Sequence, residues 1–356
     1  MKKIKTLLSA LLIVGMSTMV LAGCGETDKP ADTPGDTPAE TPAETPDAPA
    51  DDFKVVLRLS HVFSPDEQLT KSMDLVAGRI NEKTNGAVEI QTFPQAQLAV
   101  YKDGLEQVVR GSEFISVEDP SYLGDYVPDF KAFVGPMLYS DFDQYTKMIE
   151  TDLVQDMISK AEDKGIKILA LDYIFGFRNV ISNKIVVSPE DMKGLKLRTA
   201  GSQLFIDTIN AMGAVATPIP FAETLSGVSQ GVVDGLEGSE FTNIGTKVYE
   251  VATNVALTKH FLGTAGVYIS TDVWDKIPAE YQTIVEDEFR YGAEEMIKII
   301  SESYDATVAE LKELGVKFNE VDLPAFTAAT KPVYENMEGV TPGIYDLLMD
   351  ELEKMK

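Results

Sequence analysis

Beyond residue 53 the sequence alternates between short apolar runs and longer amphipathic runs, and this alternation constrains the fold more than any other feature. The segments "FKVVLRLS" (53–60), "AVEIQTF" (87–93) and "EFISVED" (113–119) have the composition of β-strands. The amphipathic segments between them have helical spacing, and the first begins with the helix-start pattern Ser64-Pro65-Asp66-Glu67. This order predicts an α/β protein with a mainly parallel sheet.

The same order recurs later in the chain. Strands are expected at 167–174, 194–199 and 214–221, with helices over 201–213 and 222–230. About 300 residues follow the N-terminal region, which is more than one hydrophobic core usually holds. The sequence therefore predicts two lobes built on one repeated pattern.

The segment from 279 to 314 contains no proline and carries apolar residues at helical spacing until Gly315. A single helix of this length measures about 54 Å, which is too long for one lobe to cover. We expect one helix that spans both lobes. The alternative is a pair of helices broken near Gly292.

The first 52 residues read as targeting and linker sequence. Residues 1–23 combine Lys2, Lys3 and Lys5 with a short apolar run, as in a signal peptide. Leu21-Ala22-Gly23-Cys24 resembles a bacterial lipobox and holds the only cysteine, so we expect Cys24 to be lipidated. Residues 24–52 are rich in Pro, Thr, Ala, Asp and Glu, which predicts an extended spacer rather than a packed domain, or alternatively a proline-motif ligand for a partner. The protein is predicted to be extracytoplasmic and anchored to the cell membrane.

The charge of the chain limits its partners. The formal net charge is −26, and removal of the three signal-peptide lysines makes it more negative. This charge argues against nucleic acid and against docking on anionic lipid. An anionic ligand would need a local cluster of positive charge.

The sequence offers little support for a catalytic, metal or nucleotide site. Residues 227–231, "GVSQG", match the G-x-S-x-G pattern of α/β hydrolases, with Asp234 and His260 downstream, but the flanking apolar residues have helical spacing instead of forming the required strand. An esterase using Ser229 is therefore the minor alternative. Metal-ligand spacing and glycine-rich nucleotide motifs are missing from the sequence, so no metal and no cofactor is expected. The sequence favours a binding protein over an enzyme.

Two arginines lie at the ends of predicted strands, Arg178 just past one and Arg198 among the last residues of another. Arg178 lies in "GFRNV" and Arg198 ends "GLKLR". Ligands of open α/β sheets gather beyond the carboxyl ends of strands, and a guanidinium group offers a planar fork of donors that matches a carboxylate. From spacing alone, the alternative for each is an ordinary surface arginine or a partner in a salt bridge.

Several separate motifs together resemble a known family. "LRLSHVF", "LGDYVPDF", "GFRNVISN", "SPEDMKGLKLRTA", "GAVATPIPFAETLSGVSQGVVDGLE", "KVYEVATNVALTKH" and "VWDKIPAEYQTIV" occur in the order found in the DctP-type solute-binding proteins of tripartite ATP-independent periplasmic (TRAP) transporters. The resemblance covers essentially the whole chain after the linker. It implies an α/β, two-lobe, periplasmic-binding-protein-like fold with a long helix spanning both lobes.

The resemblance also implies a domain organisation and a function. Lobe I is expected over 53–175 plus 264–303, and lobe II over 176–263 plus 304–356. The lobes are expected to close around a small organic acid anion and deliver it to a sodium-coupled TRAP permease. A binding protein for an ATP-driven importer or a sensor kinase is the alternative within the same class.

The family pattern carries over to specific positions. Arg198 is expected to clamp the ligand carboxylate and Arg178 to support it. Other matched positions are expected to line the cleft: His61, Glu118, Tyr173, Phe175, Phe221 and Glu237. The alternative for His61 and Glu118 is that they are polar loop groups with satisfied hydrogen bonds, and the alternative for the aromatic residues is that they belong to the core. Glu118 and Asp119 are expected either to pair with the arginines when no ligand is bound or to contact an amine or hydroxyl of the ligand.

The sequence departs from the family at 234–239, "DGLEGS", where the family usually has D-G-Q-E-N. The amide group that follows the glutamate is missing. This departure favours a monocarboxylate or oxo acid with an apolar or aromatic tail over a C4-dicarboxylate.

Overall fold

The computed structural model describes residues 53–355. The predicted signal peptide, Cys24 and the linker lie outside the described residues. The nine described strands form one sheet in the order β2-β1-β3-β8-β4-β7-β5-β6, with β9 paired to β8. The strands are β1 (Val55–Ser60), β2 (Val88–Phe93), β3 (Phe114–Glu118), β4 (Ile166–Ser182), β5 (Lys196–Thr199), β6 (Val215–Pro218), β7 (Gly235–Gly238), β8 (Asn254–Ser270) and β9 (Lys317–Asn319).

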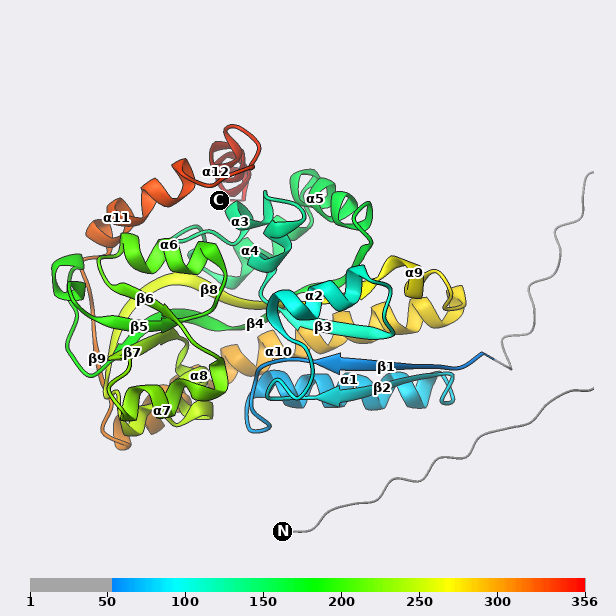
Figure 1. Cartoon of the computed structure of the whole chain (residues 1–356), viewed down its shortest axis with the longest axis horizontal. Coiled ribbons are helices and arrows are strands. Elements are labelled where there is room, and N and C mark those ends of the chain that lie inside the picture. Colours follow the sequence, from blue (N-terminus) through cyan, green and yellow to red (C-terminus); the bar gives the residue numbers. More distant parts are fainter. Residues whose placement is uncertain (1–52, 356) are drawn as a thin grey trace, which may run out of the picture. The chain divides into compact units, whose positions relative to one another are not determined.

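Two three-strand groups share one arrangement. β1 pairs in parallel with β2 and β3, and β5 pairs in parallel with β6 and β7. We call the part built on β1–β3 the first lobe and the part built on β5–β7 the second lobe (Figure 1). The repetition seen in the sequence is thus confirmed, and the fold is a two-lobe α/β fold.

The middle of the sheet differs from the mainly parallel arrangement that the sequence predicts. β4 and β8 each extend for 17 residues through the middle of the sheet and pair antiparallel with each other. β8 also pairs antiparallel with β3, and β4 with β7. The sheet is therefore mixed rather than mainly parallel. Each of these long strands passes from one lobe to the other, and they run in opposite directions, so they pair antiparallel.

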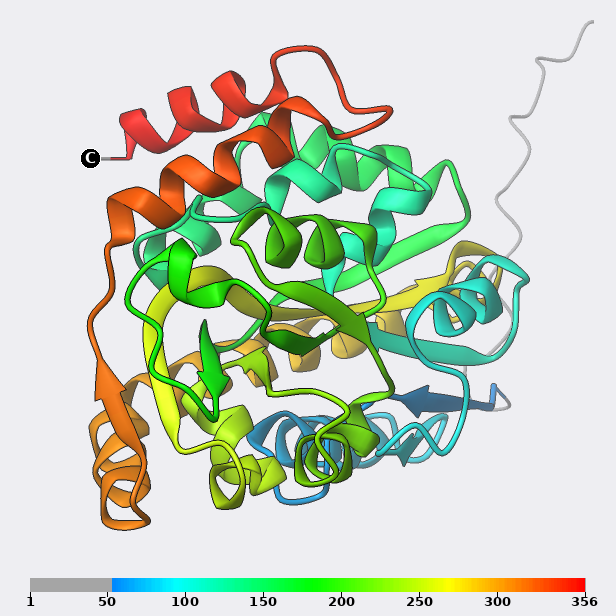
Figure 2. The same cartoon turned by 60° about the vertical axis from the view of Figure 1, so that its left-hand side comes forward.

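The described helices cover both faces of the sheet (Figures 1 and 2). They are α1 (Gln68–Lys83), α2 (Tyr101–Val109), α3 (Phe130–Phe133), α4 (Phe142–Ile149), α5 (Asp152–Glu162), α6 (Gln203–Ala211), α7 (Thr224–Ser229), α8 (Glu240–Thr246), α9 (Thr271–Trp274), α10 (Ala279–Glu313), α11 (Leu323–Glu335) and α12 (Ile344–Lys354). Among residues 53–355 no helix combines the length and apolar character needed to cross a membrane.

Helix α10 is continuous over 35 residues, so the single long helix is confirmed and the break near Gly292 is not present. Pro278 precedes its first turn, Lys312 lies in its last turn, and Gly315 with φ +94° follows its end. α10 contacts α1 on the first lobe and α8 on the second. Figure 1 shows it running along the sheet from one lobe to the other.

Each lobe has its own apolar packing. In the first lobe Leu57 and Leu59 of β1 pack with Val76 of α1 and Phe289 of α10. In the second lobe, separate clusters cover the two faces of the sheet, one around Leu197 and the other around Leu236. This packing leaves the carboxyl ends of β1, β3, β5 and β7 to face each other between the lobes.

Candidate ligand-binding site

A cavity of about 50 Å³ lies between the two lobes at these strand ends. Its wall includes Phe63, Tyr101, Tyr122, Phe175, Phe205 and Phe221, together with the charged side chains of Glu118, Asp119, Arg178 and Arg198. The volume is below the roughly 300–1,000 Å³ of usual ligand pockets because aromatic rings from both lobes fill the space. A bound ligand therefore requires some of these rings to retract.

Arg198 follows Leu197 in β5, where the strand alternation turns its side chain toward the cavity. It is 2% exposed. Its Nε donates to the carbonyl oxygen of Ile219 at 3.2 Å, one Nη donates to the Tyr101 hydroxyl at 3.5 Å, and its guanidinium lies 5.1 Å from the ring centre of Phe221. Burial lowers the pKa of Arg198, but an arginine stays charged in proteins. Among the described residues no carboxylate forms an ion pair with it, so its charge remains available to an anion.

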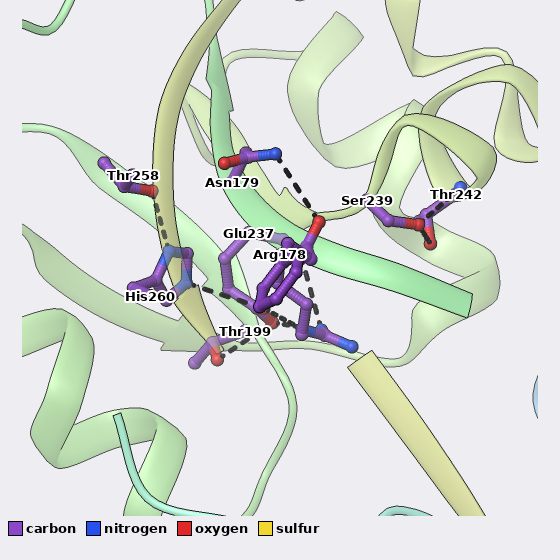
Figure 3. Close-up of polar contacts among 9 residues, drawn as sticks. Arg178, Asn179, Thr199, Glu237, Ser239, Thr242, Thr258 and His260 are labelled. Atoms are coloured by element: carbon purple, nitrogen blue, oxygen red, sulfur yellow. Dashed lines mark hydrogen bonds and ion pairs between the residues drawn. The ribbon is translucent and has the colours of Figure 1, made fainter. Parts of the chain in front are cut away.

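Arg178 is engaged differently. Its Nε and one Nη donate to the two carboxylate oxygens of Glu237 in β7, the second bond measuring 2.6 Å (Figure 3). Thr199 Oγ1 donates to the same carboxylate at 3.4 Å. Glu237 is fully buried, and the Arg178 guanidinium lies 5.7 Å from the ring centre of Phe175 and 5.0 Å from that of Phe205. Burial by itself would lower the pKa of Arg178, but the charge of Glu237, its hydrogen bond and the charge of Asp119 together raise it.

Both histidines are buried and neutral. Burial lowers the pKa of His260 to about 3 and that of His61 to about 4. His260 Nδ1 bonds the Thr258 hydroxyl at 2.8 Å, while its Nε2 lies 4.0 Å from the Glu237 carboxylate (Figure 3). That distance is not an ion pair, because an imidazole with this pKa carries no charge at neutral pH. Neither ring nitrogen of His61 has a hydrogen-bond partner within the described chain.

Glu118, the last residue of β3, and the adjacent Asp119 form no ion pair with the arginines. Glu118 accepts a hydrogen bond from the backbone N–H of Tyr101. Asp119 accepts from the backbone N–H of Ser121 at 2.8 Å and so caps the short helix Pro120–Asp125. Burial raises the pKa of Glu118 to about 8 and also raises the pKa of Asp119. Glu118 is therefore protonated and uncharged at neutral pH.

The Tyr101 side chain connects the lobes. Its hydroxyl accepts a hydrogen bond from the backbone N–H of Phe221 at 3.2 Å as well as from Arg198. Phe63 and Phe221 add a ring contact between the lobes with centres 5.9 Å apart. Ser64 Oγ also donates to the Gly245 carbonyl of α8 at 3.5 Å. These contacts hold the two lobes together around the cavity.

The structure brings some of the sequence-predicted residues to the cavity wall and not others. Arg198, Arg178, Glu118, Phe175 and Phe221 line the cavity. Glu237 lies behind Arg178. Tyr173 packs in the first-lobe core and donates its hydroxyl hydrogen to the Phe289 carbonyl at 2.8 Å, and His61 is buried beside Phe63.

Sequence reasoning missed several wall residues, among them Phe63, Tyr101, Tyr122 and Phe205. Phe63 follows β1 within the quoted motif "LRLSHVF", so its place after a strand was a usable signal. Tyr101 begins a helix and Phe205 lies within α6. Their sequence positions do not show that they face this cavity.

Ser229 has no catalytic setting. It lies at the end of α7, and its hydroxyl donates back to the Leu225 carbonyl at 2.8 Å. The buried, neutral His260 lies instead in β8, against Glu237. Within residues 53–355 no group of three or more His, Cys, Asp or Glu side chains is placed to hold a metal ion.

A two-lobe fold whose cavity lies between paired strand ends and holds one unpaired buried cation is that of a solute-binding protein. The family model described as DctP, bacterial extracellular solute-binding protein, family 7, matches residues 59–339. The chain belongs to this family.

Relatives support the same class. The C4-dicarboxylate-binding periplasmic protein DctP of Rhodobacter capsulatus is 28% identical over 289 residues, covering 80% of this chain and 86% of the relative. A TRAP periplasmic solute-binding protein from Desulfovibrio salexigens, solved in complex with diglycerolphosphate, is 62% identical with a TM-score of 0.84. Another from Fusobacterium, with bound sn-glycerol-3-phosphate, is 45% identical with a TM-score of 0.84. Each alignment to these structures covers 85% of this chain and 98% of the other. The chain is thus a binding protein of the TRAP type and not an enzyme.

Proposed function

We propose that this protein captures a small organic anion in the cavity between its lobes and delivers it to a sodium-coupled TRAP permease. The observation that carries the proposal is Arg198, a buried cation without a carboxylate partner at the end of β5. In this proposal Arg198 anchors the anion, while Arg178, Glu118, Phe175 and Phe221 complete the wall. Glu237, His61 and Tyr173 act from behind the wall by positioning these side chains.

We further propose that ligand exchange uses a rotation of the lobes. The first lobe (lobe I) would comprise 53–175 plus 264–303, and the second lobe (lobe II) 176–263 plus 304–356. The register of β4 and β8 is irregular between Ile174 and Gly176, and Gly176 has φ +102°. An irregular ladder of this kind supports a hinge there because it has fewer regular backbone bonds to distort.

For the ligand class we propose a phosphate ester of glycerol, with a monocarboxylate as the alternative. Solved relatives that are 62% and 45% identical hold diglycerolphosphate and sn-glycerol-3-phosphate, respectively. The fork of Arg198 suits a phosphate as well as a carboxylate, because both present paired oxygens to parallel N–H donors. Calorimetry with these two esters and with a panel of organic acids distinguishes the classes.

The membrane anchor remains a proposal from the sequence. We propose that lipid on Cys24 tethers the protein outside the cell membrane and that residues 24–52 act as a spacer. Cys24→Ala should move the protein from the membrane fraction to the soluble extracytoplasmic fraction. An unchanged distribution would contradict the lipid anchor.

Replacement of Arg198 tests the anchor. Arg198→Ala should weaken anion binding by about 2–5 kcal/mol, because it removes the charged partner of a buried anion. That loss corresponds to roughly thirtyfold or more in Kd, measured by calorimetry. Arg290→Ala, which changes an exposed arginine on α10, serves as the matched control and should bind normally. Unchanged affinity in a folded Arg198→Ala variant would overturn the assignment.

A further inference from the structure

The charges that line the cavity can be counted from their partners. The Arg178 guanidinium is matched by both carboxylate oxygens of Glu237, and the pair is buried from solvent. Its net charge is therefore zero. A second anionic group on a ligand would have to compete with Glu237 for the same fork of donors.

Arg198 supplies the remaining positive charge. Its two hydrogen-bond partners are the Ile219 carbonyl oxygen and the Tyr101 hydroxyl, both of which are neutral. Among the residues that line the cavity it is the cation without an acidic partner. The charge presented to a ligand is thus at most one positive unit.

The other titratable groups around the cavity add no positive charge to this count at neutral pH. Glu118 on β3 is protonated, since burial raises its pKa to about 8, and the pKa of the adjacent Asp119 is raised as well. Burial keeps His61 after β1 and His260 on β8 uncharged. Burial also raises the pKa values of Tyr101 on α2 and Tyr122, so both hydroxyl groups stay protonated.

The rest of the wall offers hydroxyl groups. Tyr122 is 6% exposed, and its hydroxyl has no partner among the described residues. Thr242 of α8 and Thr264 of β8 also line the wall; their hydroxyls bond Ser239 Oγ at 3.2 Å and the Tyr145 hydroxyl at 3.5 Å, respectively. Such groups match the alcohols of a glycerol arm, because each can donate and accept a hydrogen bond.

We propose that this cleft selects a singly charged anion, and specifically that it prefers a phosphodiester with glycerol arms to a doubly charged phosphomonoester. The proposal rests on the proposed function, in which the cavity binds a small organic anion. A phosphodiester carries one negative charge, whereas a phosphomonoester carries between about 1.5 and 2 at pH 7 because its second pKa is about 6. The second charge would be buried without a counter-ion, which is costly.

Calorimetry on the wild-type protein tests this charge preference. The probes are the diglycerol phosphate diester, sn-glycerol 3-phosphate and uncharged glycerol, each at pH 7.5 and pH 5.0. We expect the diester to bind at least tenfold tighter than the monoester at pH 7.5. At pH 5.0 the monoester has gained a proton and is singly charged, so the gap should shrink severalfold while diester affinity changes little.

The diester carries the same charge at pH 7.5 and pH 5.0, so its affinity controls for any change in the protein's own charge, including that of Asp119. Arg198 is charged at both pH values, Glu118 is mainly protonated at both, and the two histidines are neutral at both. Equal or tighter binding of the monoester at pH 7.5, or a gap that does not shrink at pH 5.0, would overturn the charge preference. Failure of every anion to bind would instead contradict the proposed function itself.

A variant tests the role of the paired arginine. Glu237→Gln removes the counter-charge and leaves Arg178 as a second unpaired cation, so relative affinity should move about tenfold toward the monoester at pH 7.5. Glu240→Gln is the matched control, since Glu240 is 1% exposed but hydrogen bonds Asn179 and does not line the cavity. An unmoved preference in a folded Glu237→Gln variant would contradict the charge count. If that variant does not fold, the wild-type pH comparison decides.

Discussion

At the scale of single residues, Tyr101 links the two lobes across the cavity. It begins α2 with φ +57°, in the left-handed region that side chains other than glycine rarely adopt. Its N–H donates to Glu118, and its hydroxyl accepts from Phe221 and Arg198. These bonds on both sides of the cavity compensate for the unfavourable backbone conformation and aim the ring across it.

Removal of this hydroxyl should weaken closure. Tyr101→Phe keeps the ring but leaves the Phe221 N–H without its partner, which costs the closed form on the order of 1–3 kcal/mol. Ligand dissociation should therefore become at least about fivefold faster in stopped-flow measurements. Tyr126→Phe, on a half-buried tyrosine outside the cavity, is the control. Slower dissociation would mean that the hydroxyl instead competes with the ligand for Arg198.

At the scale of elements, α10 is held against the first lobe at a glycine. A Cβ atom at Gly292 would lie 2.4 Å from Val76 Cγ2 of α1 and 2.5 Å from the Tyr173 hydroxyl of β4. Glycine favours a helix break on propensity alone. Here it permits close packing of three elements, and the helix continues through it.

Two glycine-to-alanine substitutions distinguish the effect of helix propensity on stability from the effect of close packing at Gly292. Gly292→Ala should lower the free energy of unfolding by about 1–3 kcal/mol, because the added methyl group forces neighbouring atoms to move. Gly78→Ala on α1, where no atom lies within 4 Å of the added Cβ, should raise it by about 0.5–1 kcal/mol. Denaturant unfolding measures both. Stabilisation by Gly292→Ala would contradict the close packing.

At the scale of the whole molecule, buried acids couple stability to pH. Burial raises the pKa of Glu67 and Glu240 to about 7 and that of Glu118 to about 8, against an ordinary value of 4.5. Between pH 4.5 and these values the folded protein holds protons that the unfolded chain has lost. The free energy of unfolding therefore falls as pH rises through this window.

The two histidines act in the opposite direction. Their folded pKa values of about 3 and 4 lie below the ordinary 6.5, so their contribution is lost as pH falls from 6.5. Three acids outweigh two histidines between pH 5 and 6.5, and above that range the acids act alone. The net negative charge of the chain adds to the loss at high pH.

Thermal melting at constant ionic strength tests this balance. We expect a higher Tm at pH 5.5 than at pH 8, and a smaller difference in Glu240→Gln, which removes one of the three acids. A Tm that rises from pH 5.5 to pH 8 in the wild-type protein would contradict the assignment of these acids as protonated in the fold.

Much of the fold and part of the site could be predicted from local sequence. The repeated pattern, the unbroken helix before Gly315 and the place of Arg198 at a strand end follow from periodicity and flanking residues. These signals act over a few residues, so they are readable in the chain itself. The predicted strand at 167–174 continues to Ser182, and β8 (Asn254–Ser270) was not predicted. The ordered motifs were sufficient to indicate the family.

Only the tertiary structure decided which distant segments meet. Arg178 and Glu237 are 59 positions apart, and their pairing arises because β4 and β7 are neighbours in the sheet. Tyr101 reaches Phe221 across 120 positions. The antiparallel β4–β8 pair likewise depends on how the chain returns between the lobes. The place of Arg198 at a strand end can be read from the sequence, whereas Arg178, predicted just past a strand, lies within β4 because that strand continues to Ser182. Whether the charge of each arginine is free or neutralised depends on the partner that folding brings to it.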